Sequence, residues 1–364
     1  MNIVHYLPYS YHIHTGGLEK IAQTLAEGLA EQQNIQTLIV ASDVRRQNNK
    51  TDLAKYSDTL FLPSWDLVYN FPVPKFWKKE FWESFQKIKK ENPDVIVTHT
   101  RFFVPSMIGG LIAKWLWCKR VHVEHGSGFV TGYPWYIKCA AWLFDRTIGL
   151  RIFRQCDEIV TISQMHRTFI SKFTHKEPMV IYNPIDYVPA EKIKHDVVHI
   201  GFIASLLPRK WCDLLLEALA NLRDQERICT IVGEGSERKK LEEMMQDLGL
   251  HDRVIFVGAD DREHRLHKFD IFVNPSHQEG LPTTVVEALL AQCIVVATDV
   301  GGTREISDQK DLILVHDTVV SVQGWLEQAF AHLDKSGQSL KAWLLQKFEP
   351  AYSIGQYLDV IQAA

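Results

Sequence analysis

The sequence predicts a two-domain α/β protein with parallel sheets, and three observations support this prediction. Short apolar runs rich in β-forming residues alternate with stretches of helical periodicity, which favours parallel strands joined by helices. The chain has 364 residues, a length that suggests two domains. A polar stretch at residues 187–196, which contains Pro189, is typical of a linker. We therefore place the first domain at residues 1–186 and begin the second at residue 187.

The composition excludes several classes of protein. Hydrophobic residues make up 46% and charged residues 23%, so the chain can bury a large core and lacks the signature of disorder. The net charge of -4 gives no reason to expect a nucleic-acid partner. The six cysteines are scattered without a C-x-x-C pair, so we expect them to be reduced and predict no metal centre and no cofactor. The chain shows no signal peptide and no apolar run of ~18 residues, so we expect a cytoplasmic protein.

The alternation of patterns predicts individual elements, which are listed here by residue number. In the first domain, strands are expected at residues 2–7, 36–41, 94–98, 120–124 and 157–163, and helices at residues 18–31, 75–91 and 104–117. Residues 43–72 are not assigned. In the second domain, strands are expected at residues 197–203, 229–232, 253–258, 271–276 and 294–297, and helices at residues 212–222, at residues 237–248 and from residue 282.

The stretch 271–291 carries the most specific chemistry in the chain. A buried strand leads into a loop, at the sheet edge where open α/β sheets bind ligands, and helical spacing begins at Pro282, which suits a first helical position. The N–H groups of Thr283, Thr284 and Val285 would open this helix without intrahelical partners. Together with the helix dipole, they predict a site for a phosphate or a diphosphate.

Two carboxylates flank this predicted anion site. Glu279 lies in the loop and Glu287 lies in the helix. Carboxylates would repel a diphosphate, but they accept hydrogen bonds well from hydroxyl groups. The pair therefore indicates a ligand with hydroxyl groups on both sides of a diphosphate, a sugar at one end and a ribose at the other. This describes a nucleotide-sugar.

The spacing of these carboxylates resembles a family signature. Glu279-Gly280, followed by Glu287-Ala288 with seven residues between the two carboxylates, is similar to the signature of the retaining family 4 glycosyltransferases of GT-B fold. This resemblance implies two Rossmann-like domains that face each other across a cleft. It also implies that residues 351–364, after a second domain of residues 187–350, form a terminal helix that returns to the first domain.

Two segments of the first domain resemble other family segments. The strand–Gly16-Gly17–helix pattern resembles the family's glycine loop, which lies near the donor phosphates and the acceptor; it is also compatible with a simple turn. His125, at the exit of the strand at residues 120–124, resembles the family histidine next to the transferred sugar. The alternative is a polar loop residue with no task.

The loop at residues 204–211 matches the family pattern only in part. The family commonly has Gly-Arg-Leu, two or three residues, and then Lys-Gly, and its Arg and Lys grip the donor diphosphate. Lys210 matches the Lys, but Ser205 stands where the Arg usually is, and Trp211 replaces the Gly. We expect Arg209 to supply the missing charge, because a guanidinium beside an ammonium can neutralise a departing diphosphate.

The resemblance implies a retaining transferase of the hexosyltransferase type that needs no metal ion. Its donor would be UDP- or GDP-linked, with the backbone near Gly258 next to the base. Glu279 would orient the sugar, Glu287 the ribose, and His125 the far side of the sugar. The expected catalytic residues are Glu279, His125 and Lys210, and the expected donor-binding residues are Gly17, Arg209, Lys210, Gly258, Gly280, Leu281, Pro282, Thr283 and Glu287.

Basic and aromatic residues in the first domain suggest the acceptor. Residues 75–91 hold six Lys and six large apolar residues at helical spacing, and residues 133–153 are also aromatic and basic. Such helices suit the inner face of an anionic membrane, but they can equally pack their aromatic side chains into a core. A lipid-linked saccharide acceptor is the prediction, as in polysaccharide or lipopolysaccharide assembly, with the enzyme peripheral at the inner membrane face.

Two other functions remain open. A nucleotide-sugar epimerase can have the same two-domain architecture, and it would release a sugar without an acceptor. A non-catalytic nucleotide-sugar sensor would bind the donor without turnover, although the pair of Glu279 and Glu287 favours an enzyme. The sequence does not reveal the sugar, the base, the acceptor, the linkage or the oligomeric state.

Overall fold

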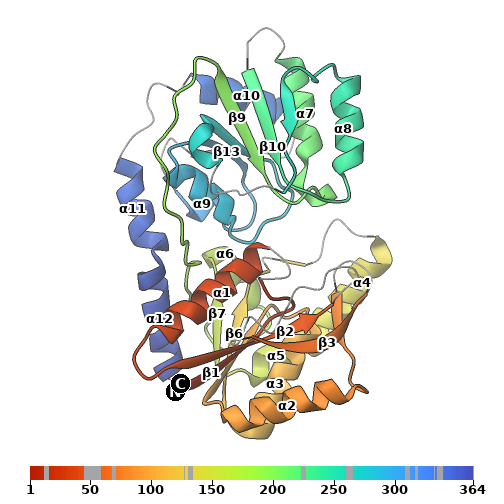
Figure 1. Cartoon of the computed structure of the whole chain (residues 1–364), viewed down its shortest axis with the longest axis vertical. Helices are drawn as coiled ribbons and strands as arrows, with labels where there is room; N and C mark the ends of the chain where they lie inside the picture. Colours follow the sequence, from red (N-terminus) through yellow and green to blue (C-terminus); the bar gives the residue numbers. More distant parts are fainter. Residues whose placement is uncertain are drawn as a thin grey trace. The chain divides into compact units, whose positions relative to one another are not determined.

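The structure is a computed structural model of the 364-residue chain. It describes residues 1–11, 16–44, 59–67, 71–126, 128–129, 134–222, 227–259, 265–307, 312–315, 319–331, 333 and 339–363. The chain forms two compact units, one of Met1–Pro184 with Pro350–Ala364 and one of Ile185–Glu349. Both units are Rossmann-like α/β folds dominated by parallel strands, so the predicted fold class is confirmed (Figure 1).

The N-terminal unit is built on a sheet with the strand order β4-β3-β2-β1-β5-β6-β7-β8. All neighbouring strands are parallel except β3 and β4. The strands are β1 (Asn2–Tyr6), β2 (Gln36–Asp43), β3 (Thr59–Leu67), β4 (Phe71–Pro74), β5 (Val95–His99), β6 (Lys119–Glu124), β7 (Glu158–Thr161) and β8 (Met179–Val180). The central strands are apolar and buried, as expected for parallel strands covered on both faces.

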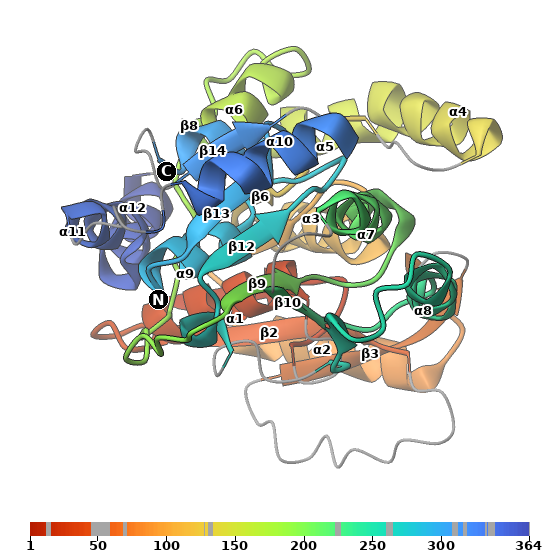
Figure 2. The same ribbon diagram turned by 90° about the horizontal axis from the view of Figure 1, so that it is seen from above.

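Helices cover the two faces of this sheet (Figure 2). α1 packs on β2 and on α12, so the last helix of the chain belongs to this unit, while α3 packs on β5. The helices are α1 (Gly17–Ala30), α2 (Lys79–Glu91), α3 (Val104–Leu116), α4 (Trp135–Phe144), α5 (Leu150–Gln155), α6 (Gln164–Ile170) and α12 (Pro350–Ala363), and a π-helical turn (Asp145–Gly149) joins α4 to α5.

The C-terminal unit is built on a sheet with the order β11-β10-β9-β12-β13-β14, in which all neighbours are parallel. The strands are β9 (Val198–Ile203), β10 (Arg227–Val232), β11 (Val254–Phe256), β12 (Ile271–Asn274), β13 (Ile294–Thr298) and β14 (Leu312–Val315). The helices are α7 (Cys212–Asn221), α8 (Arg238–Asp247), α9 (Thr283–Leu290), α10 (Val319–Phe330) and α11 (Ser339–Phe348). One large cluster of buried aliphatic side chains joins this sheet to α7, α8 and α10.

Some predicted boundaries and assignments differ from the structure. The unassigned stretch at residues 43–72 contains β3 and the start of β4, although residues 45–58 and 68–70 lie outside the described part of the chain. The predicted domain boundaries, after residues 186 and 350, compare with observed ones after residues 184 and 349. Pro282 was predicted as the first helical residue, but this is wrong: its ψ of 103° is extended, and the helix begins at Thr283.

The predicted basic helix at residues 75–91 begins at Lys79, and it has both aromatic residues that face the core and aromatic residues that face solvent. Phe81 and Ile88 are buried in the core of the N-terminal unit, so part of the aromatic face packs as an ordinary core-facing helix would. Trp77 and Trp82 remain exposed. Trp77 stacks against Trp65, and the Trp82 indole N–H donates to a backbone carbonyl, so both rings already have partners within the unit.

Candidate functional site

The site predicted in the C-terminal unit is organised by an ion pair between two loops. Lys210 follows β9 and Glu279 follows β12, and these strands are parallel neighbours, so their carboxyl ends deliver both side chains to one sheet edge. The Lys210 Nζ donates to Glu279 Oε1 at 2.5 Å, and both side chains are largely buried. A short, charge-assisted hydrogen bond in a mostly dry setting fixes both groups in one geometry.

The protonation state of Glu279 follows from its neighbours. Burial alone would raise the pKa of this carboxyl, but the charge and hydrogen bond of Lys210, a hydrogen bond with Ser276 and the charge of Arg209 together lower the pKa below its usual value. Glu279 is therefore a carboxylate at neutral pH. An ionised carboxyl can accept hydrogen bonds from ligand hydroxyl groups, as the sequence analysis requires.

A series of buried hydrogen bonds among Asn274, Ser276 and Thr298 holds the loop that carries Glu279. The Ser276 hydroxyl lies 2.7 Å from Asn274 Oδ1 and shares its one proton between this oxygen and the Glu279 carboxylate, and Asn274 Nδ2 lies 3.5 Å from Glu279 Oε1. The Thr298 hydroxyl, on the neighbouring strand β13, donates to the backbone carbonyl of Ser276. The sequence analysis did not single out Asn274 or Thr298, although both stand at the carboxyl ends of buried strands, which is the signal that could have identified them.

The helix start that was predicted to bind an anion is the start of α9, and its geometry differs from the prediction at one N–H group. The N–H of Val285 donates to the carbonyl of Pro282 at 3.1 Å, so it does not point freely to a ligand as predicted. Thr283 and Thr284 are the first two helical residues, and their N–H groups have no acceptor within the helix. The N-terminus of α9, which is the positive end of its dipole, follows the loop that holds Glu279. Leu281 and Pro282, just before the helix, are buried.

Glu287 lies in the same helix and is buried. Its exposed fraction is 5%, which is unusual for a glutamate without a structural or functional partner. It lies about one helical turn after Thr283, the first residue of α9.

A glycine turn holds the Glu279 loop in place. Gly302 donates its N–H to the Gly280 carbonyl at 2.6 Å. Gly301 has a φ of +57°, and a Cβ built on it would collide with the carbonyl oxygens of Glu279 and Gly280. Only glycine therefore fits at residue 301 without moving the loop. The sequence shows this Gly-Gly turn but does not reveal that it packs against Glu279.

The loop between β9 and α7 explains one departure from the family pattern. Trp211 has φ 48° and ψ 43°, the left-handed conformation that glycine adopts without strain. Its indole stacks on His277 with 4.6 Å between ring centroids, and the His277 N–H donates to the Arg209 carbonyl at 2.8 Å. Arg209 itself is exposed, and Ser205 is exposed too. The two loops are thus joined by a backbone bond, a ring stack and an ion pair.

The backbone near Gly258, which was predicted to contact a base, already makes hydrogen bonds within the C-terminal unit. Gly258 has a φ of +77°, and its carbonyl accepts the Gly233 N–H at 2.7 Å. The Val257 N–H donates to the Ile231 carbonyl at 3.1 Å. A base next to Gly258 would therefore use the second lone pair of its carbonyl or other atoms of this turn.

In the N-terminal unit, His125 ends a chain of three histidines. His5 Nδ1 lies 3.4 Å from His99 Nε2, and His99 Nδ1 lies 3.1 Å from His125 Nε2. Burial is the main cause that lowers the pKa of His125 to about 4 and of His5 to about 3, and it lowers the pKa of His99 as well. All three rings are neutral at pH 7. The other predicted residue of this unit, Gly17, begins α1.

The donors and acceptors in the His5–His99–His125 hydrogen bonds follow from the environment of the His5 ring. His5 Nε2 is buried and has no hydrogen-bond partner among the described residues. An unpaired lone pair is tolerated there better than an unpaired N–H. We therefore expect His5 and His99 to donate from Nδ1 and His125 to accept at Nε2, which leaves its proton on Nδ1. The sequence did not predict His5 and His99 as site residues, although His5 lies in β1 and His99 ends β5, the strand between β1 and β6.

An ion-pair cluster lies beside this chain. Arg101 is 1% exposed and contacts Glu124 at 3.1 Å and Asp145 at 2.7 Å. Burial opposes ionisation of Glu124, but the Arg101 charge and the His122 contact hold its pKa well below the usual range. The cluster ties the π-helical turn after α4 to the ends of β5 and β6.

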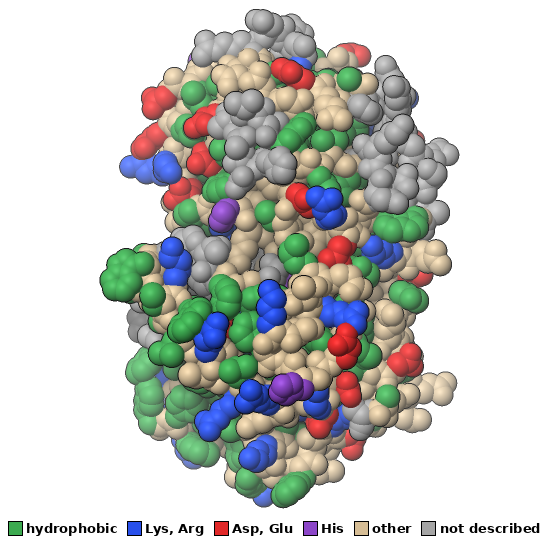
Figure 3. Space-filling model, turned by 180° about the vertical axis from the view of Figure 1, so that it is seen from behind, with side chains coloured by type: hydrophobic (Ala, Val, Ile, Leu, Met, Phe, Trp, Pro, Cys, Tyr) green, Lys and Arg blue, Asp and Glu red, His purple; other side chains and the backbone are tan. Residues whose placement is uncertain are grey.

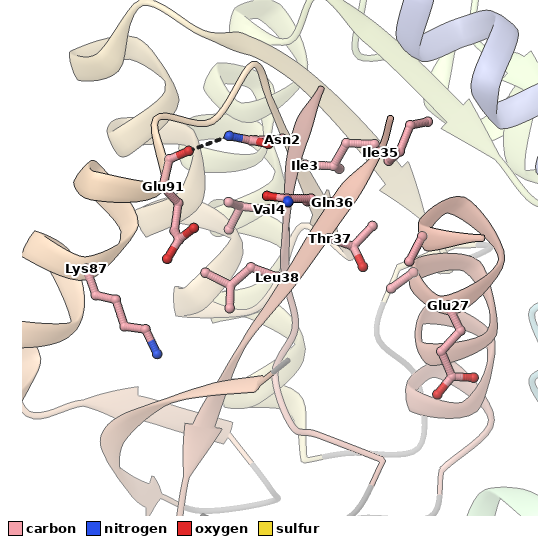
Figure 4. Close-up of a pocket in the computed structure, with 12 residues that line it drawn as sticks. Asn2, Ile3, Val4, Glu27, Ile35, Gln36, Thr37, Leu38, Lys87 and Glu91 are labelled. Carbon is pink, nitrogen blue, oxygen red and sulfur yellow. Dashed lines mark hydrogen bonds between the residues drawn. The ribbon is translucent and has the colours of Figure 1, made fainter. Parts of the chain in front are cut away.

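The described residues contain neither a metal-binding cluster nor a membrane-spanning helix. No group of three or more His, Cys, Asp or Glu side chains that could hold a metal ion occurs among them. Within the same ranges, no helix has both the length and the apolar character needed to cross a membrane. A cavity of about 490 Å³ (Figure 4) lies beside Asn2, Gln36 and Lys87, at the amino ends of β1 and β2. Open α/β sheets bind ligands at the opposite ends of their strands, so we assign it no ligand.

Comparison with known proteins identifies the family of both units. Residues 15–188 match the family model "Glycosyltransferase Family 4", and residues 186–327 match "Glycosyl transferases group 1". An uncharacterised glycosyltransferase of Methanocaldococcus jannaschii is 26% identical over 82% of this chain and 81% of its own length. An O-antigen biosynthesis glycosyltransferase of Escherichia coli is 25% identical over 57% of this chain and 59% of its own. A protein of Anabaena, solved with UDP-glucose, has the same fold, with a TM-score of 0.75 at 17% identity over 100% of both chains.

Proposed function

This chain belongs to the group 1 glycosyltransferases, and from that premise we propose that it transfers a sugar from a UDP- or GDP-linked donor to a saccharide acceptor. We propose further that the anomeric configuration is retained and that no metal ion takes part. The acceptor is lipid-linked, and the reaction serves the assembly of a cell-surface polysaccharide or lipopolysaccharide. The E. coli relative named for O-antigen biosynthesis supports a role in the assembly of such a polysaccharide.

One observation carries the proposal: the buried pair of Lys210 and Glu279 beside the start of α9. A donor diphosphate fits here because the ammonium of Lys210, the exposed guanidinium of Arg209 and the N–H groups of Thr283 and Thr284 are all positive in character. When the bond from the anomeric carbon to the diphosphate oxygen breaks, negative charge grows on the diphosphate. The same groups then stabilise it more strongly, which lowers the barrier.

The two buried carboxylates hold the rest of the donor. Glu279 accepts hydrogen bonds from hydroxyl groups of the sugar, and Glu287 accepts them from the ribose. In the N-terminal unit, His125 is the proposed contact of the transferred sugar, with its Nδ1–H as donor. The acceptor oxygen bonds to the anomeric carbon on the face that the diphosphate leaves. The departing diphosphate oxygen takes the proton of the acceptor hydroxyl, so no separate base is needed.

A thermal-shift series with UDP, GDP, ADP and CMP tests the donor class. A nucleotide that binds only the folded protein raises its melting temperature, so UDP or GDP should stabilise the protein and the other two should not. Lys210→Met should abolish most of the shift. Glu243→Gln, which removes a glutamate from an exposed pair with Lys239, is the matched control and should leave the shift intact. No shift with either UDP or GDP would contradict the donor assignment.

Transfer itself needs a second measurement. Glu279→Gln should lose most sugar transfer while the protein stays folded, and NMR of the product should show the anomeric configuration of the donor. Activity should survive an excess of EDTA. Sugar released without an acceptor would favour the epimerase, and donor binding without turnover under any acceptor would favour the sensor.

A further inference from the structure

The helix α4 has an apolar surface that nothing in the described chain covers. None of its residues is buried, although it consists mostly of aromatic and aliphatic residues. Trp135 is 74% exposed and Leu143 is 57% exposed, and Tyr136, Trp142 and Cys139 are exposed as well. A helix that is apolar on all sides is normally buried, so its exposure requires a partner.

The exposed residues form one face at helical spacing. At 100° per residue, five of the seven exposed side chains of α4, at positions 135, 136, 139, 142 and 143, lie within an arc of about 120°. The opposite side of the helix, at Ile137, Ala141 and Phe144, is half-buried, and Phe144 packs on Phe102 at 5.6 Å. The helix therefore uses one apolar face to attach to its unit and presents a second one outward.

The charges around this face have one sign. Lys138, Arg146, Arg151 and Arg154 are exposed on α4 and on the two turns that follow it. The acidic residue of this segment, Asp145, is buried and neutralised by Arg101. Figure 3 shows hydrophobic and basic side chains next to each other on one face of the N-terminal unit. An outward apolar face with a basic border complements an anionic, amphipathic surface.

We infer that α4 docks the protein on an anionic lipid bilayer, with its tryptophans at the level of the headgroups. Trp and Tyr are favoured at this depth because the ring is apolar and the N–H or O–H reaches water. The basic side chains contact anionic headgroups, and each such charge should strengthen partitioning about fivefold at low salt. The inference deepens the proposed function, since a lipid-linked acceptor lies at such a surface.

Two tryptophans at the start of α2, Trp77 just before the helix and Trp82 within it, differ from those of α4 and provide a control. Trp77 and Trp82 are 60% and 56% exposed, comparable with the exposed residues of α4. Trp77 stacks on Trp65, and the Trp82 N–H is bonded to the Phe76 carbonyl. These rings are held on their own unit, so removing them should change lipid binding little.

Co-sedimentation of the whole protein with vesicles tests the inference. We expect binding to phosphatidylcholine vesicles with 30% phosphatidylglycerol, roughly tenfold less binding to pure phosphatidylcholine, and weaker binding as salt rises. Trp135→Gln with Trp142→Gln, and separately Lys138→Glu with Arg151→Glu, should each lower binding at least about tenfold. Trp77→Gln with Trp82→Gln should bind as the wild type does.

Three results would overturn the inference. The wild type could fail to bind anionic vesicles, the α4 variants could bind as well as the wild type, or sizing without vesicles could show a dimer that the α4 variants abolish, in which case a second copy covers α4. The UDP and GDP thermal shifts are measured on the same variants. Vesicle binding lost with nucleotide shifts intact assigns the effect to α4 and leaves the donor proposal untouched; nucleotide shifts absent throughout reject the donor proposal alone.

Discussion

The Trp211 ring packs against the His277 ring at a tilt of 35°, while the Trp211 backbone is left-handed. One residue therefore carries backbone strain and also joins the two loops of the candidate donor site. The family pattern has glycine at this position, and the φ of 48° gives the physical reason, since glycine adopts it freely. In this chain the indole contact offsets the cost of a side chain there. The substitution therefore preserves the loop geometry rather than abolishing it.

This balance predicts an unusual order of stability. Trp211→Ala loses the ring contact and keeps the left-handed strain, whereas Trp211→Gly loses the contact and the strain together. We expect the glycine variant to be more stable than the alanine variant by about 1 kcal/mol, the reverse of the usual order within helices. Urea unfolding of the two variants measures the difference. Equal stabilities, or a more stable alanine variant, would show that residue 211 is not left-handed in solution.

Gly301 offers a test of how the Glu279 loop is held. Gly301→Ala places a methyl group against the Glu279 and Gly280 carbonyls in addition to the left-handed penalty. Gly249→Ala is the matched control, because Gly249 has a φ of +69° but open space around its would-be Cβ. Each should lose about 1 kcal/mol of stability from the backbone. Only Gly301→Ala should also lose roughly tenfold or more in transfer, because a displacement near 1 Å disrupts substrate geometry.

If both variants retained full transfer, the turn would not position Glu279. A second comparison separates folding from positioning. Gly301→Ala should melt at a lower temperature than Gly249→Ala because its methyl group also meets two carbonyls, and kcat measured well below both melting temperatures should fall only in Gly301→Ala. Loss of activity in Gly249→Ala would point to global instability instead.

The sequence predicted the periodic parts of the fold well and the pairing of loops poorly. Apolar runs such as those of β1, β9 and β12 are local signals, and parallel strands of this kind can be recognised from period and composition. The strands β3 and β4 were missed because β3 contains Pro63 and polar residues and pairs with β4 at an edge, where apolar patterning is weak.

The site followed the same division. Glu279 was predicted because it follows a strand and its spacing to Glu287 resembles a family signature, and Lys210 because its loop matches the family pattern in part. Their direct contact was not predicted, since side-chain reach between two loops leaves no trace in periodicity. The packing of Gly301 on Glu279 and the His5–His99–His125 chain likewise depend on long-range contacts.

The Lys210–Glu279 pair predicts a pH-dependent contribution to stability. The pKa of Glu279 in the folded protein lies below the ordinary value of 4.5. Its stabilising effect is therefore fully present above pH 4.5 and is lost as the pH falls through the lower folded pKa. Glu279→Gln should be less stable than the wild type at pH 7, by about 2 kcal/mol, and the difference should shrink below about pH 4.5. Urea unfolding at pH 7, 5 and 4 measures it.

Removing Lys210 should raise the pKa of the Glu279 carboxyl, which Lys210 lowers in the wild type. In Lys210→Met, burial acts with less opposition, so the pKa of Glu279 should rise, and NMR of a labelled Glu279 carboxyl would detect it. The double variant Lys210→Met with Glu279→Gln should recover part of the lost stability, since no buried charge then lacks its partner. Additive losses in the double variant would mean that the two side chains do not interact.

The histidine chain predicts a loss of stability on acidification, in the same direction as for Glu279 but beginning at a higher pH. In the folded protein, burial lowers the pKa of His5 to about 3 and that of His125 to about 4, whereas an unfolded histidine has a pKa near 6.5. Between these values the unfolded chain binds protons that the folded chain does not. Stability should therefore fall as the pH drops below about 6.5, by roughly 1.4 kcal/mol per pH unit for each buried histidine.

His5→Phe isolates the contribution of one ring. The variant keeps an aromatic ring of similar size but cannot be protonated, so between pH 6.5 and 4.5 its stability should fall less steeply than that of the wild type, by about one histidine's share. The stability difference at pH 8, where the unfolded histidine is almost entirely unprotonated, reports the effect of replacing the ring, including the lost hydrogen bond to His99. Identical slopes in the two proteins would mean that His5 is protonated in the folded state, and the directed hydrogen-bond chain to His125 would then have to be abandoned.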